Sequence, residues 1–374
     1  GSNKPLYARK RHQIILFSSH EEYQTFFRRR SGATVNSVGF YATEQKLSFL
    51  FVSEPPKTST WLHEVTHQLF YELGAQVKDV ASDQNIWAIE GVAMYMESLR
   101  DQGHFVTVGG FESYRLQFAR YRKTVDQFYW PLQQLAAFGN SQLSSHVEIR
   151  RLYSQCVGLA HFLMDADNGK YRKPFFDLLK KIYTNTSTAG TLRQLSGHSF
   201  EELDAAYAEF LVVTDEHLAT LRPGISLKAL CLADGQITNQ GLQHLSGQRE
   251  LSWLDLTRCE ITDDSSMVFA GLVKLNQLSL ESTKITDKSM AVIGALPNLE
   301  ELDLSLTPVG DAGVLHLQGN NKLTVLWLTG TKVSDESERV LSTLANLELL
   351  ELTSTAMSAL TIQQVLSDLP KLKP

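Results

Sequence analysis

The second half of the chain repeats one hydrophobic pattern with a strict period of 24 residues. The leucines of this pattern, L-x-x-L-x-L, would all lie on the buried side of a short strand. Units in register predict a solenoid in which each strand stacks against the next. The units begin at Leu227, Leu251, Leu275, Leu299, Leu323 and Leu347.

This pattern is typical of leucine-rich repeats and predicts an α/β solenoid of six 24-residue repeats. Position 9 is mostly threonine or cysteine, whose hydroxyl or thiol can hydrogen-bond to the turn backbone. The sixth unit has Ala359 at position 13, as expected of a degenerate terminal repeat. In the other units we expect position 13 to supply the N-cap of the returning helix, through Asn239, Asp263, Asp287, Asp311 and Asp335.

Strand positions 3 and 5 of each repeat should face the concave side of the solenoid. They place Trp253 and Trp327 among carboxylates such as Asp255, Asp303 and Glu351. Such a surface suits a protein or peptide partner. Contact with the first part of the same chain accounts for it equally well, so both interpretations stay open.

The first 220 residues show no repeat. A small sheet followed by helices, up to about Leu218, is an α+β arrangement. With Pro223-Gly224 as the junction, we expect one domain over residues 1–220 and a second over 221–374. The predicted elements before Pro55-Pro56 are strands at Gln13–Ser18, Ser37–Tyr41 and Lys46–Val52 and a helix at His20–Arg30.

Charge is distributed unevenly over the 374 residues. Residues 1–220 carry 23 basic and 23 acidic side chains, whereas residues 221–374 carry 12 and 18, which accounts for the whole net charge of −6. An acidic repeat region argues against a nucleic-acid partner. We interpret the basic runs Arg9–Arg11 and Arg28–Arg30 as solvated surface rather than as a docking patch.

Location is poorly constrained by the sequence. No run of about 18 apolar residues is present, so we expect no membrane-spanning helix. Three cysteines, Cys156, Cys231 and Cys259, form no disulfide framework. Gly1-Ser2 resembles a cloning remnant, and an export signal could have been removed with it. We therefore expect an exported or cell-envelope-associated protein rather than a cytoplasmic one.

The motif HEVTH places His63 and His67 four residues apart on a predicted helix, so both imidazoles project to one side. That spacing lets both bind one Zn²⁺ at about 2.0–2.1 Å. Glu64 is offset by about 100° from His63, so it can act as general base without coordinating the metal. HExxH thus indicates a zincin site; two exposed helical histidines are the structural alternative. We expect the stripe Leu62, Val65, Leu69 and Leu73 to be the buried face.

A catalytic zinc needs a third protein ligand and an open position. The helix predicted within IWAIEGVAMYME places Glu90 among apolar residues and glycine, 23 residues after His67. A lone carboxylate is costly in such surroundings, and a role as metal ligand would account for it. Two imidazoles and one carboxylate accept several divalent ions, of which Zn²⁺ is the one we expect.

HEVTH followed by WAIEGVAMYME resembles the gluzincin clan of metallopeptidases. Residues 12–98, with QIILFSSHEEYQTFF and GFYATEQKLSFLF, resemble a bacterial family of that clan that is found with leucine-rich repeats in planctomycete-type proteins. The resemblance extends more weakly through YSQCVGLAHFL, residues 153–163. It implies a zincin-like fold, with His63, His67 and Glu90 as zinc ligands and Glu64 as base.

Zincins add a tyrosine or histidine donor beside the metal, because peptide hydrolysis passes through an oxyanion. Tyr153 is our candidate, since it lies in a helical segment that resembles the family. Tyr95, Tyr114 and His161 are rivals. Glu97 either orients a ligand histidine or lies at the surface.

Together these features predict a zinc metallopeptidase of the gluzincin type, with a peptide or protein substrate and a protein partner on the concave face of the repeats. The strand at Lys46–Val52 would form the cleft edge that pairs with extended substrate. An alternative from another class is a catalytically inactive zincin scaffold that binds proteins through its repeats. A weaker alternative makes the repeats an inhibitory lid.

Overall fold

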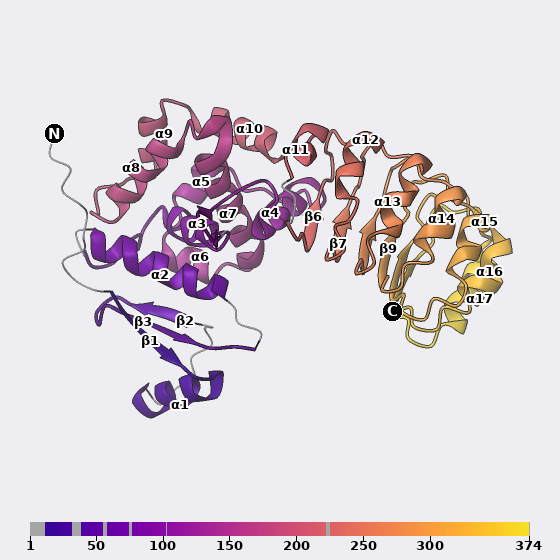
Figure 1. The fold of residues 1–374 in the computed structure, drawn as a ribbon, viewed down its shortest axis with the longest axis horizontal. Helices are drawn as coiled ribbons and strands as arrows, with labels where there is room; N and C mark the ends of the chain where they lie inside the picture. The colour runs from indigo at the N-terminus through magenta and orange to yellow at the C-terminus, as the bar shows by residue number, and fades with distance from the viewer. Residues whose placement is uncertain are drawn as a thin grey trace. The chain divides into compact units, whose positions relative to one another are not determined.

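The computed structural model describes residues 12–31, 39–54, 58–74, 77–101, 103–221 and 225–373 (Figure 1). The chain divides into two compact units. Unit 1 comprises Gly1–Arg115 and Tyr129–Tyr207, and unit 2 comprises Leu116–Phe128 and Ala208–Pro374. The division expected from the sequence differs, because it assigns residues 116–128 and 208–220 to the first part. The Pro223-Gly224 junction and Arg9–Arg11 lie outside the described residues.

Unit 1 opens with a three-stranded sheet of β1 (Gln13–Phe17), β3 (Leu47–Phe51) and β2 (Gly39–Ala42), in the order β1-β3-β2. β1 is parallel to β3, and β2 is antiparallel to it. β3 is therefore the central strand, with neighbours on both edges. The prediction that the Lys46–Val52 strand forms an open cleft edge is wrong, because only β1 and β2 are edge strands of this sheet. The first two residues of the predicted strand Ser37–Tyr41 lie outside the described residues.

Helix α1 (His20–Ser31) covers one face of this sheet and helix α2 (Thr58–Leu73) covers the other (Figure 1). The α1 side is an aromatic core, because the HEEYQTFF segment places its rings one helical turn apart. Tyr23 is fully buried between Phe17 and Phe51, at ring centroid distances of 5.6 and 5.2 Å. Phe26 and Phe27 complete the core against Phe49.

The contact between α2 and the sheet contains a buried polar pair, which corrects the prediction for this helix. Leu69 and Leu73 of the predicted buried stripe are 37% and 68% exposed. Gln68 is buried instead, accepting a 2.7 Å hydrogen bond from Ser48 and donating to the carbonyl oxygen of Gln13 at 3.1 Å. The spacing of leucines misled the prediction because the buried amide finds partners on the strands, which offsets its desolvation.

The remaining elements of unit 1 are mostly helices, packed around α3 (Ile86–Met96). No helix of the described residues is long and apolar enough to cross a membrane. The elements that follow α3 in the chain, up to the first repeat, are β4 (Arg100–Asp101), β5 (Val106–Thr107), α4 (Tyr114–Thr124), α5 (Leu132–Ala136), α6 (Asn140–Ser144), α7 (Ile149–Asp165), η1 (Ala166–Asn168), α8 (Arg172–Ile182), α9 (Thr191–Ser196), α10 (Phe200–Leu211) and α11 (Asp215–Ala219).

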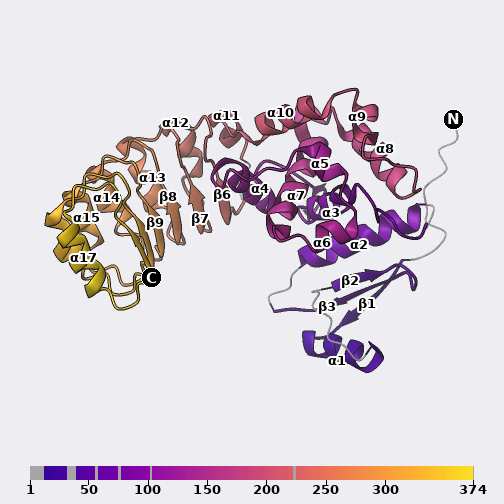
Figure 2. The same cartoon turned by 180° about the vertical axis from the view of Figure 1, so that it is seen from behind.

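Unit 2 contains a six-stranded parallel sheet in chain order, β6 to β11. Partners in the register are 24 residues apart, as with Leu254 and Leu278. The strands line one side and the helices the other (Figures 1 and 2). The strands are β6 (Ala229–Cys231), β7 (Trp253–Asp255), β8 (Gln277–Ser279), β9 (Glu301–Asp303), β10 (Val325–Trp327) and β11 (Leu349–Glu351). The helices are α12 (Asn239–Leu242), η2 (Gln243–Leu245), η3 (Asp263–Ser265), α13 (Ser266–Ala270), α14 (Asp287–Ile293), α15 (Asp311–Val314), η4 (Leu315–Leu317), η5 (Asp335–Ser337), α16 (Glu338–Leu341) and α17 (Ala359–Asp368).

The polar residue at position 13 has a different role from the predicted N-cap. The N-cap is the residue before it, as in Thr262, whose side chain accepts a hydrogen bond from the Asp264 N–H. The carboxylate of Asp263 reaches the next repeat instead, where it accepts from the Thr286 N–H at 2.9 Å and from the Thr286 hydroxyl at 2.6 Å. The prediction of the cap was therefore one residue late, and these carboxylates hold consecutive repeats together.

Residues 208–221 and 116–128 group with the repeats because they cover the first strand and helix. Asp215 of α11 accepts from the Thr238 N–H at 2.9 Å, repeating the contact that Asp263 makes. The Gln117 side chain accepts from the Cys231 N–H of edge strand β6 at 3.1 Å. An uncovered edge strand invites pairing with other chains, so these two segments act as the N-terminal cap.

Each repeat turns after its strand through one residue in the left-handed region. Leu306 at this position has φ 56° and a side chain that is 56% exposed, whereas the next repeat has Gly330 at φ 67°. Left-handed backbone costs an ordinary L-residue about 1–2 kcal/mol. Leu306 therefore stores strain that its exposed side chain does little to offset.

We predict that Leu306→Asn raises the free energy of unfolding of unit 2 by about 1 kcal/mol, because asparagine tolerates this backbone conformation. The measurement is thermal and urea unfolding of the full chain. Leu315→Asn is the matched control: Leu315 is 54% exposed, but its φ is −53°, so no strain is relieved. Equal effects of the two substitutions would contradict the strain argument.

Candidate metal centre

Helices α2 and α3 bring three of the predicted site residues together. The ligand atoms of His63, His67 and Glu90 all lie within 4.8 Å of one another. The two Nε2 atoms are 3.1 Å apart, and Glu90 oxygens lie 3.6 Å from His63 Nε2 and 3.9 Å from His67 Nε2. Tetrahedral ligands about 2.0–2.1 Å from a zinc ion are separated by about 3.3 Å. The three side chains therefore fit one such ion with small adjustments.

Glu90 owes its position to a helix that is buried on every side. All residues of α3 except Glu90 and Met96 are buried, and the Glu90 side chain is 17% exposed. Burial alone would raise the pKa of the Glu90 carboxyl, but His63 and His67 outweigh it and lower that pKa. A carboxylate inside such a helix is thus compensated chiefly by the charge of His63.

Gly91 lets α7 approach the site. A Cβ atom at this position would lie 2.5 Å from the carbonyl oxygen of Cys156 and 3.2 Å from the Ala160 Cβ. Only glycine fits so close to the α7 backbone. The approach brings Tyr153, one helical turn before Cys156, to the wall of the same pocket as Glu90.

A second set of contacts orients His63 through the Nδ1 atom of its ring. Its Nδ1–H donates to Glu97 Oε1 at 3.0 Å, which leaves Nε2 facing the other ligand atoms. Arg115 donates two hydrogen bonds to the Glu97 carboxylate, from Nε at 2.9 Å and from Nη2 at 3.1 Å. Of the two roles predicted for Glu97, orienting a histidine or lying at the surface, the hydrogen bond to His63 supports the first. Sequence reasoning missed Arg115, since it lies 18 residues from Glu97 in a different element.

The two histidines differ in their affinity for protons. Burial opposes charge on His63, but the nearby Glu90 carboxylate and the hydrogen bond to Glu97 outweigh it and raise the pKa of His63 to about 10. Burial, with repulsion from His63, lowers the pKa of His67 to about 4. A cation bound to His63 Nε2 would take the place of the proton on that atom and leave the Nδ1–H on Glu97.

Glu64 lies on the pocket wall outside the three-residue cluster. Burial and the nearby Glu90 raise the pKa of the Glu64 carboxyl above its usual range, despite the opposing charge of His63. The backbone N–H of Tyr41 in β2 donates to this carboxylate. A Cβ on Gly39 would lie 3.3 Å from the Glu64 Cγ, so β2 packs closely against it. The edge strand β2 thus holds Glu64, which is not part of the cluster of His63, His67 and Glu90.

The pocket at this site has a volume of about 420 Å³ and includes all five predicted site residues. Its walls come from β2, α2, α3 and α7. Burial and the charge of Glu90 raise the pKa of the Tyr153 hydroxyl, so it stays protonated. Sequence reasoning missed Tyr183, which also lines the pocket. The lining also includes Phe40, Tyr41, Thr43, Tyr71, Val80, Ile86, Ile89 and Asn140.

The rivals of Tyr153 do not line this pocket. The Tyr95 hydroxyl donates to Asp165 at 2.8 Å, and the His161 ring contacts the same carboxylate at 3.2 Å. Tyr114 is half exposed at the start of α4. Among the candidates that the sequence offered for the donor, only Tyr153 lines the pocket of the cluster within the described residues.

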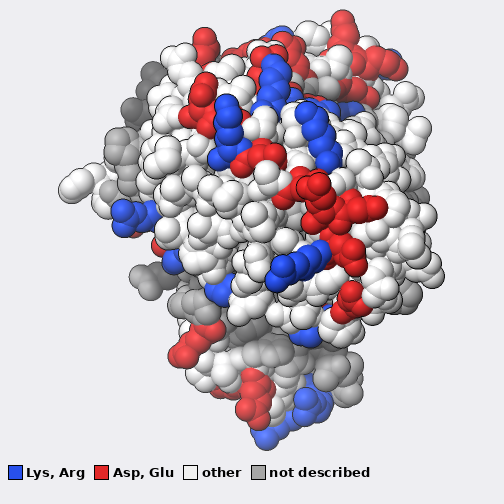
Figure 3. Space-filling model, turned by 90° about the vertical axis from the view of Figure 1, so that its right-hand side faces the viewer, with Lys and Arg blue, Asp and Glu red and all other residues white. Residues whose placement is uncertain are grey.

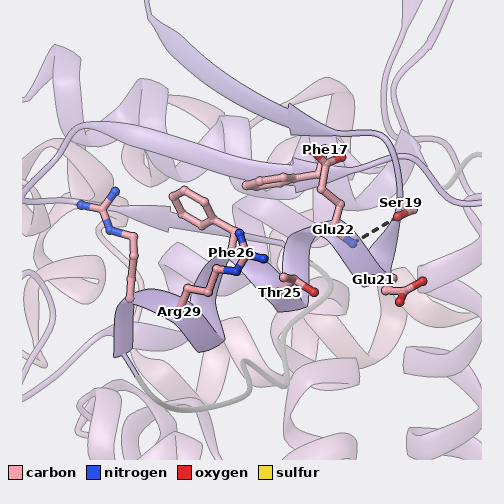
Figure 4. Close-up of a pocket in the computed structure, with 8 residues that line it drawn as sticks. Phe17, Ser19, Glu21, Glu22, Thr25, Phe26 and Arg29 are labelled. Carbon is pink, nitrogen blue, oxygen red and sulfur yellow. Dashed lines mark hydrogen bonds between the residues drawn. The ribbon is translucent and has the colours of Figure 1, made fainter.

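A larger hollow of about 630 Å³ lies beside α1 (Figure 4). Phe17 and Phe26 form its apolar wall, and Glu21 and Arg29 its charged rim. Glu22 already accepts from the N–H and hydroxyl of Ser18, at 2.8 and 2.7 Å. With no histidine or cysteine in its lining, this hollow offers no comparable ligand set.

Comparisons with known families match two parts of the chain. Residues 57–188 match a family described as "Protein of unknown function (DUF1570)", and residues 249–309 match "Leucine rich repeat". No curated protein matches the chain. The predicted leucine-rich repeats are thereby confirmed as a class. Neither description names a peptidase, so the resemblance to gluzincins stays a prediction.

We predict that Gly91→Ala lowers the free energy of unfolding of unit 1 by about 1–3 kcal/mol, because the new methyl group forces α3 and α7 apart. Urea unfolding measures this loss. Gly190→Ala is the control, since a Cβ there meets nothing closer than 4.0 Å. If Gly91→Ala unfolds like the wild type, the close approach does not constrain the site.

Proposed function

We propose that unit 1 is a zincin-type domain that hydrolyses peptide bonds with a zinc ion, held by His63, His67 and Glu90. The observation that carries the proposal is the convergence of these three side chains within 4.8 Å, with Glu64 on the wall of the same pocket. Two imidazoles and one carboxylate form the ligand set of many catalytic zinc sites, which keep a fourth position open.

Zinc in such a site supplies Lewis-acid polarisation of a carbonyl oxygen and makes water acidic enough to act as nucleophile near neutral pH. Glu64 is the general base in our proposal. Burial raises the pKa of its carboxyl, which strengthens the carboxylate as a proton acceptor. The Tyr41 N–H holds it in place, and from there it would pass the proton to the leaving amine.

Tyr153 is the donor that we assign to the oxyanion. Its hydroxyl is kept protonated by burial and by Glu90, and it lies on the pocket wall supplied by α7. A fixed donor aimed at developing charge is the usual way to stabilise such a transition state. Tyr183 is a second hydroxyl of the same pocket.

We infer that an extended substrate lies along β2. Among the described residues, β2 pairs only with β3, so its other edge carries no strand, although the Tyr41 N–H is held by Glu64. Phe40, Tyr41 and Thr43 place that strand and the turn after it on the pocket wall. Addition of a peptide strand to an exposed edge is a common mode of recognition. This assignment replaces β3, the strand favoured by sequence.

Unit 2 supplies a protein-interaction module in this proposal, as leucine-rich repeats suggest. We propose that its six strands belong to a solenoid of six repeats, from Leu227 to the α17 cap. An inactive zincin scaffold that binds partners through the repeats is the competing function. Glu64 distinguishes the two, since only a hydrolase requires a base at that position.

We predict about one zinc per chain in the wild type, about one in Glu64→Gln and none in His63→Ala, because Glu64 lies outside the ligand set. Hydrolysis of a peptide library should fall by at least about 10²-fold in Glu64→Gln. Elemental analysis and a cleavage screen measure the two effects. Zinc without cleavage in the wild type would favour the inactive scaffold, and absence of metal would refute the zinc site.

We also predict that Arg115→Ala and Glu97→Gln lower the affinity for Zn²⁺ by about 10–100-fold, the usual effect of losing a residue that orients a ligand. Competition with a chromophoric chelator measures this affinity without any substrate. Arg193→Ala removes an exposed arginine far along the chain, on α9, and serves as control. Unchanged affinity in both site variants would show that Glu97 does not position His63.

A further inference from the structure

The two tryptophans of the repeat strands have different surroundings. Trp253 of β7 is covered by α4, whose Phe118 and Tyr121 rings lie 5.3 and 5.5 Å from the indole. Phe118, Tyr121 and Trp253 all belong to unit 2. Trp253 is therefore occupied from within the chain, as one of the two interpretations of the sequence held.

The helix that occupies Trp253 has a distinct chemistry. Its sequence, YRLQFARYRKT, alternates aromatic and cationic residues over Tyr114–Thr124. The repeats also contact this helix through a polar group. Arg258 Nη2 donates a hydrogen bond to the carbonyl oxygen of Thr124 at 3.0 Å, at the C-terminal end of the helix. Helix α4 is thus one example of a segment that packs on this sheet face.

Trp327 of β10 lies in a different row of the sheet from Trp253, at strand position 5 instead of position 3, and no ring packs on it among the described residues. In the parallel register it lies between Asp303 of β9 and Glu351 of β11. Neighbouring strands are about 4.8 Å apart, so carboxylates flank the indole on both sides. Its ring contacts no other aromatic ring of the described residues, and neither carboxylate forms an ion pair there.

The rest of this face is acidic. Positions 3, 5 and 7 of the second to sixth repeats contain no lysine or arginine, whereas they contain Asp255, Glu281, Glu301, Asp303 and Glu351. Burial, and for Glu281 also repulsion from Asp303, raises the pKa of the Asp303 and Glu281 carboxyls. Figure 3 views the molecule from the right-hand side of Figure 1, where acidic side chains form a band with several lysine and arginine side chains beside it.

We propose that the sheet face around Trp327, Asp303 and Glu351 binds a cationic, aromatic segment of a partner protein. A lysine or arginine placed over the indole would gain a cation–π contact and two flanking carboxylates. The same face already accepts the aromatic side chains Phe118 and Tyr121 from its own chain, at Trp253, two strands before β9. Charge complementarity and continuity with the α4 interface therefore identify the partner's chemistry.

This interaction is independent of hydrolysis by unit 1. An acidic or phosphorylated partner is disfavoured, because it would approach the carboxylates of this face without a nearby lysine or arginine at the strand positions. A purely apolar partner would cover the carboxylates of Asp303 and Glu351 without bringing an opposite charge. The cationic segment satisfies both constraints.

The test uses the full chain and a fluorescein-labelled peptide with the sequence of residues 114–124, YRLQFARYRKT. Fluorescence anisotropy measures its dissociation constant. We expect saturable binding that weakens as salt is raised, because the contact depends on charge. A peptide with glutamate in place of each arginine and lysine should not bind.

Asp303→Asn combined with Glu351→Gln should raise the dissociation constant at least about tenfold, as should Trp327→Ala. The double amide variant keeps side-chain size, and thermal unfolding verifies that it folds like the wild type. Glu336→Gln with Glu338→Gln is the matched control, with the same change of charge on the helical side of the fifth repeat, which lies between the repeats of Asp303 and Glu351.

Equal loss in the control variant would reduce the effect to net charge and overturn the proposal. So would undiminished binding in the Asp303/Glu351 variant, or binding of the glutamate peptide with similar affinity. Loss in Asp255→Asn but not in Trp327→Ala would show that the peptide merely replaces α4 at Trp253, which also overturns it.

Discussion

The burial of one carboxylate, Glu90, is the constraint on which the candidate site depends. A charged group on a helix enclosed on every side is tolerated only when it is paired, and here His63 and His67 face it. The pairing extends outward, because His63 donates a hydrogen bond to Glu97, and Glu97 accepts one from Arg115 at the surface. Each buried charge is thus compensated by the next, and the chain of contacts fixes the direction in which the imidazoles point.

Close packing turns that cluster into a pocket. The contact of Gly91 with the α7 backbone brings Tyr153 to the Glu90 side, and Gly39 brings β2 to the Glu64 side. Two glycines therefore set the distances between the ligand cluster, the base and the hydroxyl. The walls of the pocket depend on backbone approach more than on the identity of the apolar residues around it.

The features that could be predicted from the sequence are those that helical spacing and the repeat period determine. His63 and His67 share a face because they are four residues apart, and the leucine pattern places β6 to β11 in register. It could not find Arg115 or Tyr183, which reach the site only through the tertiary fold. Nor could it foresee that Gln68 would be buried in place of Leu69, since the partners that make a buried amide acceptable lie on strands far away in the chain.

The boundary between the units escaped the sequence for a related reason. Helix α4 lies between two segments of unit 1 in the chain, yet most of it packs on the repeats, because the edge strand β6 needs a cover and Gln117 supplies an acceptor for its N–H. Capping a solenoid is a requirement of the whole sheet and leaves no local signature. The same requirement explains why an aromatic helix lies at Trp253, where Phe118 and Tyr121 cover the indole. Past that helix the strand face continues to Trp327, which lies between the carboxylates of Asp303 and Glu351.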